Sequence, residues 1–155
     1  MSSTIINKRK QEGLRNAASN GKINCVRNYL NDDTVNVNGT DDCGSTALHH
    51  ACCEDHRDVA ELLLDHGANI DARSDSNSTP LMEACWTGRA AITKLLLDRR
   101  CAVKAVDDYG EIALHKACWN GYTECVKELL LAHAGADTTV QNKRGQTRKR
   151  ITRLS

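Results

Sequence analysis

The chain of 155 residues contains no phenylalanine, one proline and five aromatic residues, two of them tryptophan and three tyrosine. A core of large rings is therefore excluded. Leucine, isoleucine, valine, alanine and cysteine must fill the interior, which suits short helices that pack closely. No apolar run approaches the roughly 18 residues that a membrane-spanning helix needs, so the sequence predicts a protein that does not cross a bilayer.

The N-terminus also lacks the apolar stretch, roughly 7–15 residues long, that marks a secretory signal. We therefore expect the protein to stay in the cytoplasm, the nucleus or both. Thiols remain reduced in those compartments, so the eight cysteines are expected to be free.

The net charge of +1 conceals two regions of opposite sign. Residues 143–155 hold six basic residues and no acidic one, which leaves 15 basic and 20 acidic residues in 1–142, a net charge of −5. An acidic body argues against nucleic-acid binding over the whole surface, because phosphate binding needs a continuous basic face. The basic segment alone could act as a nuclear-import signal or as a tether to nucleic acid or anionic lipid, or it could simply be a solvated terminus.

A repeat of 33 residues is the strongest signal in the sequence. Leucine recurs at Leu48, Leu81 and Leu114, and alanine follows three positions later in each copy. A fourth copy around Leu14 lies 34 positions upstream of Leu48. Each copy continues with a glycine or a substitute for it, a second apolar run with the spacing of one helix face, and a turn rich in Gly, Asp and Asn.

The opening Thr79-Pro80-Leu81 and its counterparts Thr46-Ala-Leu48-His49 and Ile112-Ala-Leu114-His115 resemble the ankyrin repeat. The resemblance implies an all-α ankyrin-repeat solenoid of stacked antiparallel helix pairs with β-hairpin-like loops. We place the repeat domain at residues 11–147, with units at about 11–43, 44–76, 77–109 and 110–144. Residues 1–10 are expected to form a flexible N-terminal segment.

The pattern breaks in a fifth unit. Gly145-Gln146-Thr147 opens it, but Arg148-Lys149-Arg150 follows where the buried leucine would stand. Residues 145–155 are therefore interpreted as a basic partial fifth repeat, a capping helix or a tail.

The cysteines and histidines fit the repeat better than they fit a metal or catalytic site. Cys52, Cys85 and Cys118 share one small, buried position of the first helix, and Cys43, Cys53 and Cys101 are expected to be exposed. Adventitious zinc uptake by His50, Cys53 and His56 is conceivable, but no paired metal-ligand motif supports a dedicated site. No catalytic motif remains unexplained by the repeat, so we predict no catalytic residues, no metal, no cofactor and no enzyme activity.

The resemblance also implies where a partner binds, because ankyrin proteins use a concave face made by the hairpin tips and by two variable residues after the small pair of the first helix. The expected partner-binding residues at these positions are Asp42, Cys53, Glu54, Asp75, Trp86, Thr87, Asp108, Tyr109, Glu111, Trp119 and Asn120.

Three of the five aromatic residues fall in that set, and exposed Trp and Tyr often dominate binding energy at protein interfaces. We predict a monomeric, non-catalytic protein-interaction module, an adaptor or an occluding inhibitor without a small-molecule substrate. Its groove would anchor a partner on Trp86 and Trp119, and its acidic rim would favour a partner with a basic segment. Cation–π contact of a partner arginine with an indole would combine both features. The alternative is that the basic C-terminal tail carries the function and the repeats act as its scaffold.

Overall fold

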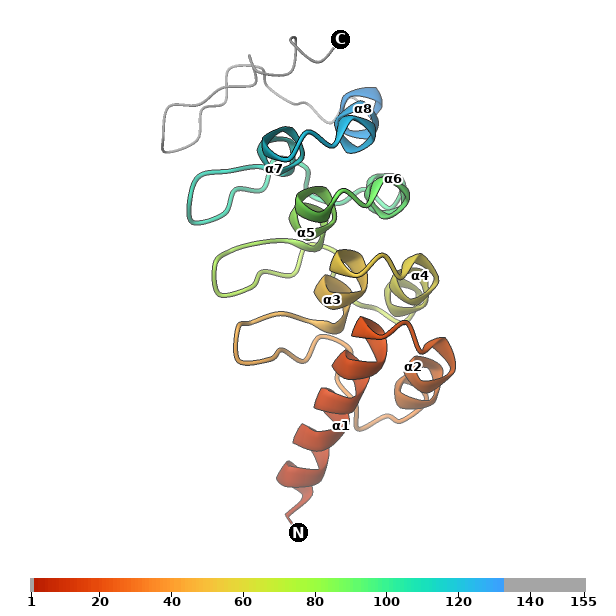
Figure 1. Ribbon diagram of the computed structural model, residues 1–155. Helices are drawn as coiled ribbons and strands as arrows, with labels where there is room; N and C mark the ends of the chain where they lie inside the picture. Colours follow the sequence, from red (N-terminus) through yellow and green to blue (C-terminus); the bar gives the residue numbers. More distant parts are fainter. Residues whose placement is uncertain (1, 133–155) are drawn as a thin grey trace.

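The computed structural model describes residues 2–132, which form eight helices in four pairs (Figure 1). The predicted partial repeat at 145–155 lies outside the described residues. The helices are α1 (Ser3–Ser19), α2 (Ile23–Leu30), α3 (Ala47–Cys53), α4 (Arg57–Asp65), α5 (Pro80–Thr87), α6 (Ala90–Asp98), α7 (Ala113–Trp119) and α8 (Thr123–Leu131).

The four pairs stack in a single row. Helices α1, α3, α5 and α7 form one layer, α2, α4, α6 and α8 form the other, and the loops before α3, α5 and α7 project to one side (Figure 1). Within residues 2–132 there is no strand, and one isolated antiparallel bridge joins Thr40 to Thr46. The expected all-α repeat solenoid is confirmed. No helix in this part of the chain is long and apolar enough to cross a membrane.

Capping chemistry sets the helix starts and turns. The Thr79 hydroxyl accepts the backbone N–H of Met82, and Pro80 occupies the first turn, where its missing N–H costs nothing. The turn between the paired helices requires a left-handed residue in every repeat, and it is Gly21, Asp55, Gly88 or Gly121. Asp55 performs this role with φ of 67°, a conformation that its short polar side chain tolerates better than most.

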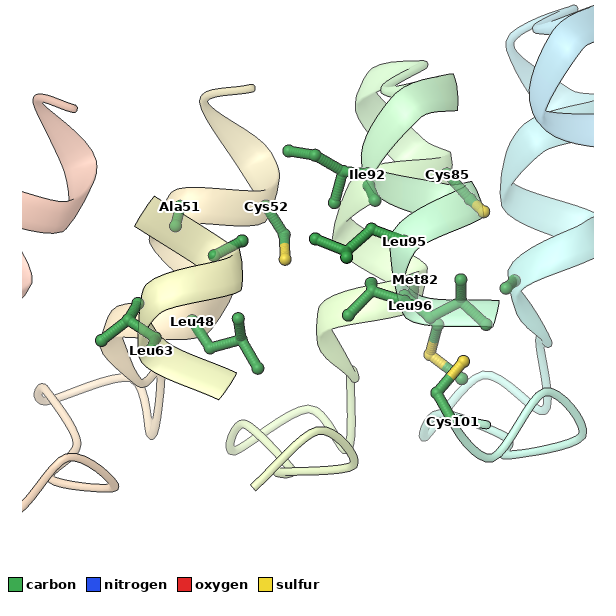
Figure 2. Packing of buried hydrophobic residues seen from close by; sticks show 14 of the residues in the cluster. Leu48, Ala51, Cys52, Leu63, Met82, Cys85, Ile92, Leu95, Leu96 and Cys101 are labelled. Atoms are coloured by element: carbon green, nitrogen blue, oxygen red, sulfur yellow. The ribbon is translucent and has the colours of Figure 1, made fainter. Parts of the chain in front are cut away.

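The repeated leucines and alanines form one continuous core along the stack. Leu14, Leu48, Leu81 and Leu114 are all buried, as predicted. Figure 2 shows Leu48 and Leu63 in the second repeat, on α3 and α4, and Leu95 and Leu96 of α6 in the next repeat, all of them members of this core. Because each pair buries its apolar side chains against the next, stability depends on the interfaces between neighbours.

Backbone hydrogen bonds join successive hairpins into a ladder. The Asp75 N–H donates to the Cys43 carbonyl at 3.0 Å, and the Asp108 N–H donates to the Ser76 carbonyl at 3.1 Å. Gly44 permits the first contact, because its φ is +73° and a Cβ there would stand 2.7 Å from the Asp75 nitrogen. The hairpin tips are therefore fixed relative to one another.

The N-terminal segment corrects one expectation, since residues 3–10 are helical rather than flexible. Lys8, Arg9 and Lys10 are good helix formers, residues 3–10 contain no proline or glycine, and they continue α1 upstream of the core. Lys10 Nζ holds Asp32 Oδ2 at 2.6 Å and Thr34 Oγ1 at 3.0 Å. The bond from Lys10, aided by Thr34, lowers the pKa of Asp32 to about 2.

Cysteine burial departs from expectation at four positions. Two of them are half-buried: Cys53, which was expected to be exposed, and Cys118, which was expected to be buried. Cys101 is buried rather than exposed, because its N–H bonds to the Leu96 carbonyl and turns the chain back against Met82 (Figure 2). Cys25, placed on the apolar face of α2 by its spacing, is exposed. Cys43 is exposed as predicted. All eight cysteines are free thiols.

His49 ties its helix start to the next repeat. Its Nδ1 accepts the Thr46 N–H at 3.1 Å, so Nε2 carries the proton and donates to the Ser78 carbonyl at 3.1 Å. Burial, only partly offset by the bond to Ser78, lowers the pKa of His49 below 6.5. Protonation of Nδ1 would remove the acceptor for Thr46, so the neutral ring is the folded form.

Stability should consequently fall as the pH drops from 7 towards 5. A depressed folded-state pKa means that the unfolded chain binds the proton first, near pH 6.5, which costs up to about 1.4 kcal/mol per pH unit. Urea unfolding across this range should show a weaker pH dependence in His49→Gln than in wild type. The exposed-site control His66→Gln should retain the wild-type slope, and equal slopes in all three proteins would contradict this role.

Candidate partner-binding groove

The hairpins and the helices α3, α5 and α7 together form a surface that we call the groove. Each hairpin is held by a side chain of its first residue, as in the fourth repeat, where Asp107 Oδ1 accepts the N–H groups of Tyr109 and Glu111 at 2.9 Å each. Asp41 does the same for Cys43 and Ser45. This capping leaves Tyr109 projecting from the tip, 59% exposed.

Lys116 on α7 is the central cation of the groove. Its Nζ lies 2.6 Å from Asp107 Oδ2 and 2.7 Å from Glu111 Oε2. Burial alone would lower the pKa of Lys116, but the bonds to these two carboxylates outweigh it and raise the pKa. Burial alone would likewise raise the pKa of Asp107, but the bond from Lys116 helps to outweigh it, and the pKa is lowered. The raised pKa of Lys116 and the lowered pKa of Asp107 keep these two groups charged together at neutral pH.

Two aromatic rings enclose the same ammonium group. Lys116 Nζ stands 5.6 Å from the centroid of the Trp86 ring and 5.7 Å from that of Tyr109, within cation–π range of both. Residues of this chain thus already make the contact that we expected from a partner's arginine. Trp86 remains 49% exposed, so much of its indole surface is open to a partner.

The aromatic residues surround one pocket of about 480 Å³, the tryptophan pocket. Trp86, Tyr109 and Trp119 all line it, as sequence reasoning placed them at neighbouring groove positions. Buried Met82 and half-buried Glu83 of α5 line it as well, together with Ser76, Ser78 and Asn120. A pocket that joins exposed indoles to a few polar groups suits the capture of a side chain.

Glu111 corrects the expectation of an exposed acidic rim at that position. It is only 8% exposed, because its carboxylate turns inward to Lys116 and accepts the Trp119 indole N–H at 3.1 Å. The carboxylate therefore orients the Trp119 ring, which is 43% exposed. Glu111 lines the tryptophan pocket without offering its charge at the rim.

The other predicted residues are distributed along the groove. Asp42, Glu54, Asp75 and Asp108 are exposed, as is Asn120. Asn120 Nδ2 donates to the Trp86 carbonyl at 3.0 Å and links the third repeat to the fourth. The remaining two, Cys53 and Thr87, are half-buried, with the Cys53 carbonyl accepting Arg89 Nε and the Thr87 hydroxyl bonding to the Glu83 carbonyl.

Five of the eleven predicted positions line the tryptophan pocket and six do not. Asp42 does not reach the tryptophan pocket and instead lines a separate depression of about 420 Å³ with Lys8, Arg15 and His50. Of the eleven predicted residues, Trp86, Tyr109, Glu111, Trp119 and Asn120 line the tryptophan pocket.

The structure does not gather a metal site from the conceivable zinc ligands. His50 Nε2 is bonded to Asp41 at 2.8 Å, and His56 Nε2 is bonded to the Ser19 carbonyl at 3.0 Å. Over residues 2–132, no cluster of three or more His, Cys, Asp or Glu could hold a metal ion.

Glu83 and Lys116 are two of the six pocket-lining residues outside the predicted set, the others being Ser76, Ser78, Met82 and Asp107. The repeat register contained a signal for Glu83 and Lys116. His50, Glu83 and Lys116 stand at one repeat position, each directly before the repeated alanine. In every case the side chain bonds to its own hairpin: His50 to Asp41, Glu83 to the Ser78 hydroxyl at 2.6 Å, and Lys116 to Asp107. A polar residue that recurs at one repeat position between buried neighbours therefore indicates a side-chain bond to the hairpin of its own repeat.

This stack of helix pairs and its hairpin ladder define a repeat protein of the ankyrin type. The family model of three ankyrin repeats matches residues 3–74 and again 71–142, so the chain belongs to the ankyrin-repeat family. Ankyrin repeats generally mediate protein–protein interactions and are typically non-catalytic.

Similar stretches occur in proteins of varied description. The chain is 48% identical over 50 residues to osteoclast-stimulating factor 1 of Bos taurus. The matched stretch covers 32% of this chain and 23% of that protein. It is 39% identical over 51 residues to palmitoyltransferase akr1 of Schizosaccharomyces pombe, covering 33% and 8%. A third match, to human BCL-6 corepressor-like protein 1, is 41% identical over 64 residues and covers 41% and 4%. The chain therefore spans less than a quarter of each relative's length.

Proposed function

We propose that this protein is a monomeric, non-catalytic recognition module, an adaptor or an occluding inhibitor, that binds a partner protein through the groove. The observation that supports the proposal is the gathering of Trp86, Tyr109 and Trp119 around one pocket. The chain has only five aromatic residues, and these three have between 43% and 59% of their surface exposed. Exposed rings of this kind supply most binding energy at many interfaces.

The pocket favours a partner segment that carries arginine or lysine. Asp107 and Glu111 are engaged by Lys116, but Glu83 also lines the pocket, and its carboxylate accepts one hydrogen bond from Ser78. Asp75 and Asp108 add negative charge at the hairpin tips. A basic side chain entering beside Trp119 would meet this charge and an open ring face together.

The double variant Trp86→Ala/Trp119→Ala should lose its partner. Truncating one hot-spot residue often costs about 2 kcal/mol or more, so affinity should fall at least about thirtyfold. Pull-downs from cell extract, quantified by mass spectrometry, should show proteins captured by wild type and lost from this variant. The matched control Val106→Ala/Leu131→Ala removes exposed apolar side chains that do not line the pocket. Equal capture by a correctly folded double-tryptophan variant would refute the groove.

A second candidate function concerns the basic tail, which lies outside the described residues. Its six basic residues without an acid support a role in nuclear import or in tethering the chain to nucleic acid or anionic lipid. As part of the same proposal, the protein resides in the cytoplasm, the nucleus or both. To test this second function, the six basic residues are replaced by glutamine in the 155-residue chain. The nuclear accumulation of this variant is then compared with that of wild type.

A further inference from the structure

The tryptophan pocket has an excess of negative charge. Three carboxylates line it, those of Glu83, Asp107 and Glu111, against the single ammonium of Lys116. Because Lys116 binds Asp107 and Glu111, its own charge is fully engaged within the pocket. Exposed Asp75 and Asp108 extend the negative surface towards the hairpin tips. A cationic segment is thus the complementary occupant.

The same chain supplies such a segment at residues 143–155. Its basic residues are Lys143, Arg144, Arg148, Lys149, Arg150 and Arg153, with no acid among them. Arginine is abundant there, and its planar guanidinium stacks on indole rings and pairs with carboxylates. These are the two kinds of group that the tryptophan pocket offers.

The segment is also within reach of the pocket. Ten residues, 133–142, separate it from the end of the described chain, and the eleven residue steps from 132 to 143 span up to about 36 Å when extended. The pocket lies between α5 and α7, which belong to the last two described repeats, and neighbouring helices pack only about 10 Å apart. A tether of this length gives an effective concentration on the order of millimolar.

We propose that residues 143–155 of the chain bind the tryptophan pocket of the same molecule and compete with an external partner. The inference rests on the proposed function, because it assigns an internal occupant to the groove proposed for partner binding. The inference also gives the opposite charges of the groove and the tail one explanation, because the basic tail occupies the acidic groove. A partner must then displace the tail, so any event that neutralises or captures the tail would open the groove.

Trp86 and Trp119 are the only tryptophans, so tryptophan emission, excited selectively over tyrosine, reports on this pocket alone. The test compares the full-length wild type with a full-length variant in which all six basic tail residues are replaced by glutamine. Raising the salt concentration from about 0.01 M to about 1 M shortens the screening length from roughly 30 Å to 3 Å. Emission should respond to salt in wild type and much less in the variant.

A synthetic peptide of residues 143–155 should then bind the glutamine variant and restore the wild-type emission. Adding Asp75→Asn, Glu83→Gln and Asp108→Asn to the variant should weaken peptide binding at least tenfold. The matched control Asp33→Asn, Asp58→Asn, Asp98→Asn removes the same charge from exposed acids that neither line the pocket nor lie on the hairpins beside it, and should weaken binding less than threefold.

Three results would overturn the proposal. One is identical emission from wild type and the glutamine variant at low salt, with no response to the peptide. Another is a salt response that grows with protein concentration, which would assign the occupant to a second copy. The third is peptide binding that the pocket variants leave unchanged. If the tail fails but the double-tryptophan variant still loses captured proteins, the groove function stands without this occupant.

Discussion

Replacing Lys116 with methionine is expected to lower the free energy of unfolding by about 3 kcal/mol or more. The Asp107 and Glu111 side chains are only 3% and 11% exposed, and methionine would leave both carboxylates without their cation. Removing one partner of a buried charge cluster is far more costly than removing an exposed salt bridge. Urea unfolding followed by circular dichroism measures the effect.

Two further variants separate the effect of losing the Lys116 charge from the general effect of replacing a lysine with methionine. Lys104→Met removes an exposed lysine and should change stability by less than about 0.5 kcal/mol. Lys116→Met/Glu111→Gln removes one stranded charge and should recover part of the loss. Should Lys116→Met prove as stable as Lys104→Met, the buried cluster would contribute nothing to the fold.

Leu81→Ala is expected to cost about 2–5 kcal/mol. Leu81 lies on α5 in the middle of the stack and is 1% exposed, so the lost side chain would leave a cavity that rigid neighbours cannot close. Because both α3 and α7 pack against α5, the defect would weaken the contacts on each side of the third repeat. Thermal or urea unfolding should show a much earlier transition than in wild type.

The control for this substitution is Leu131→Ala, which removes the same atoms from a side chain that is 73% exposed. It should unfold within about 0.5 kcal/mol of wild type. Near-equal losses in the two variants would count against a core organised around the repeated leucines.

Sequence periodicity predicted the architecture because each buried position recurs at the same place in every unit. A single copy of the Leu81 pattern would have been ambiguous, but its recurrence at Leu48 and Leu114 fixed the helix pairs and the core side chains. Asn77, in the turn before α5, stands in the repeat register of Gly44 and Gly110 and shares their left-handed conformation, with φ of 58°.

Side-chain pairing in the groove could not be predicted in this way. From its hairpin position alone, Glu111 was predicted to lie on the exposed acidic rim. Its burial follows instead from its bonds to Lys116 and to the Trp119 N–H. Both partners lie on α7, which begins two residues after Glu111. The start of α1 was missed for a related reason, since Lys10 finds Asp32 only once the first helix pair has folded.

The hairpin ladder provides a separate exchangeable proton at two of the three interfaces between repeats. The Asp75 amide proton is held by the Cys43 carbonyl and the Asp108 amide proton by the Ser76 carbonyl, so each bond crosses one boundary of the stack. Such a proton exchanges with deuterium only when its bond opens. Comparing the exchange rates of these two amides would therefore show which boundary parts first when the molecule loosens from an end.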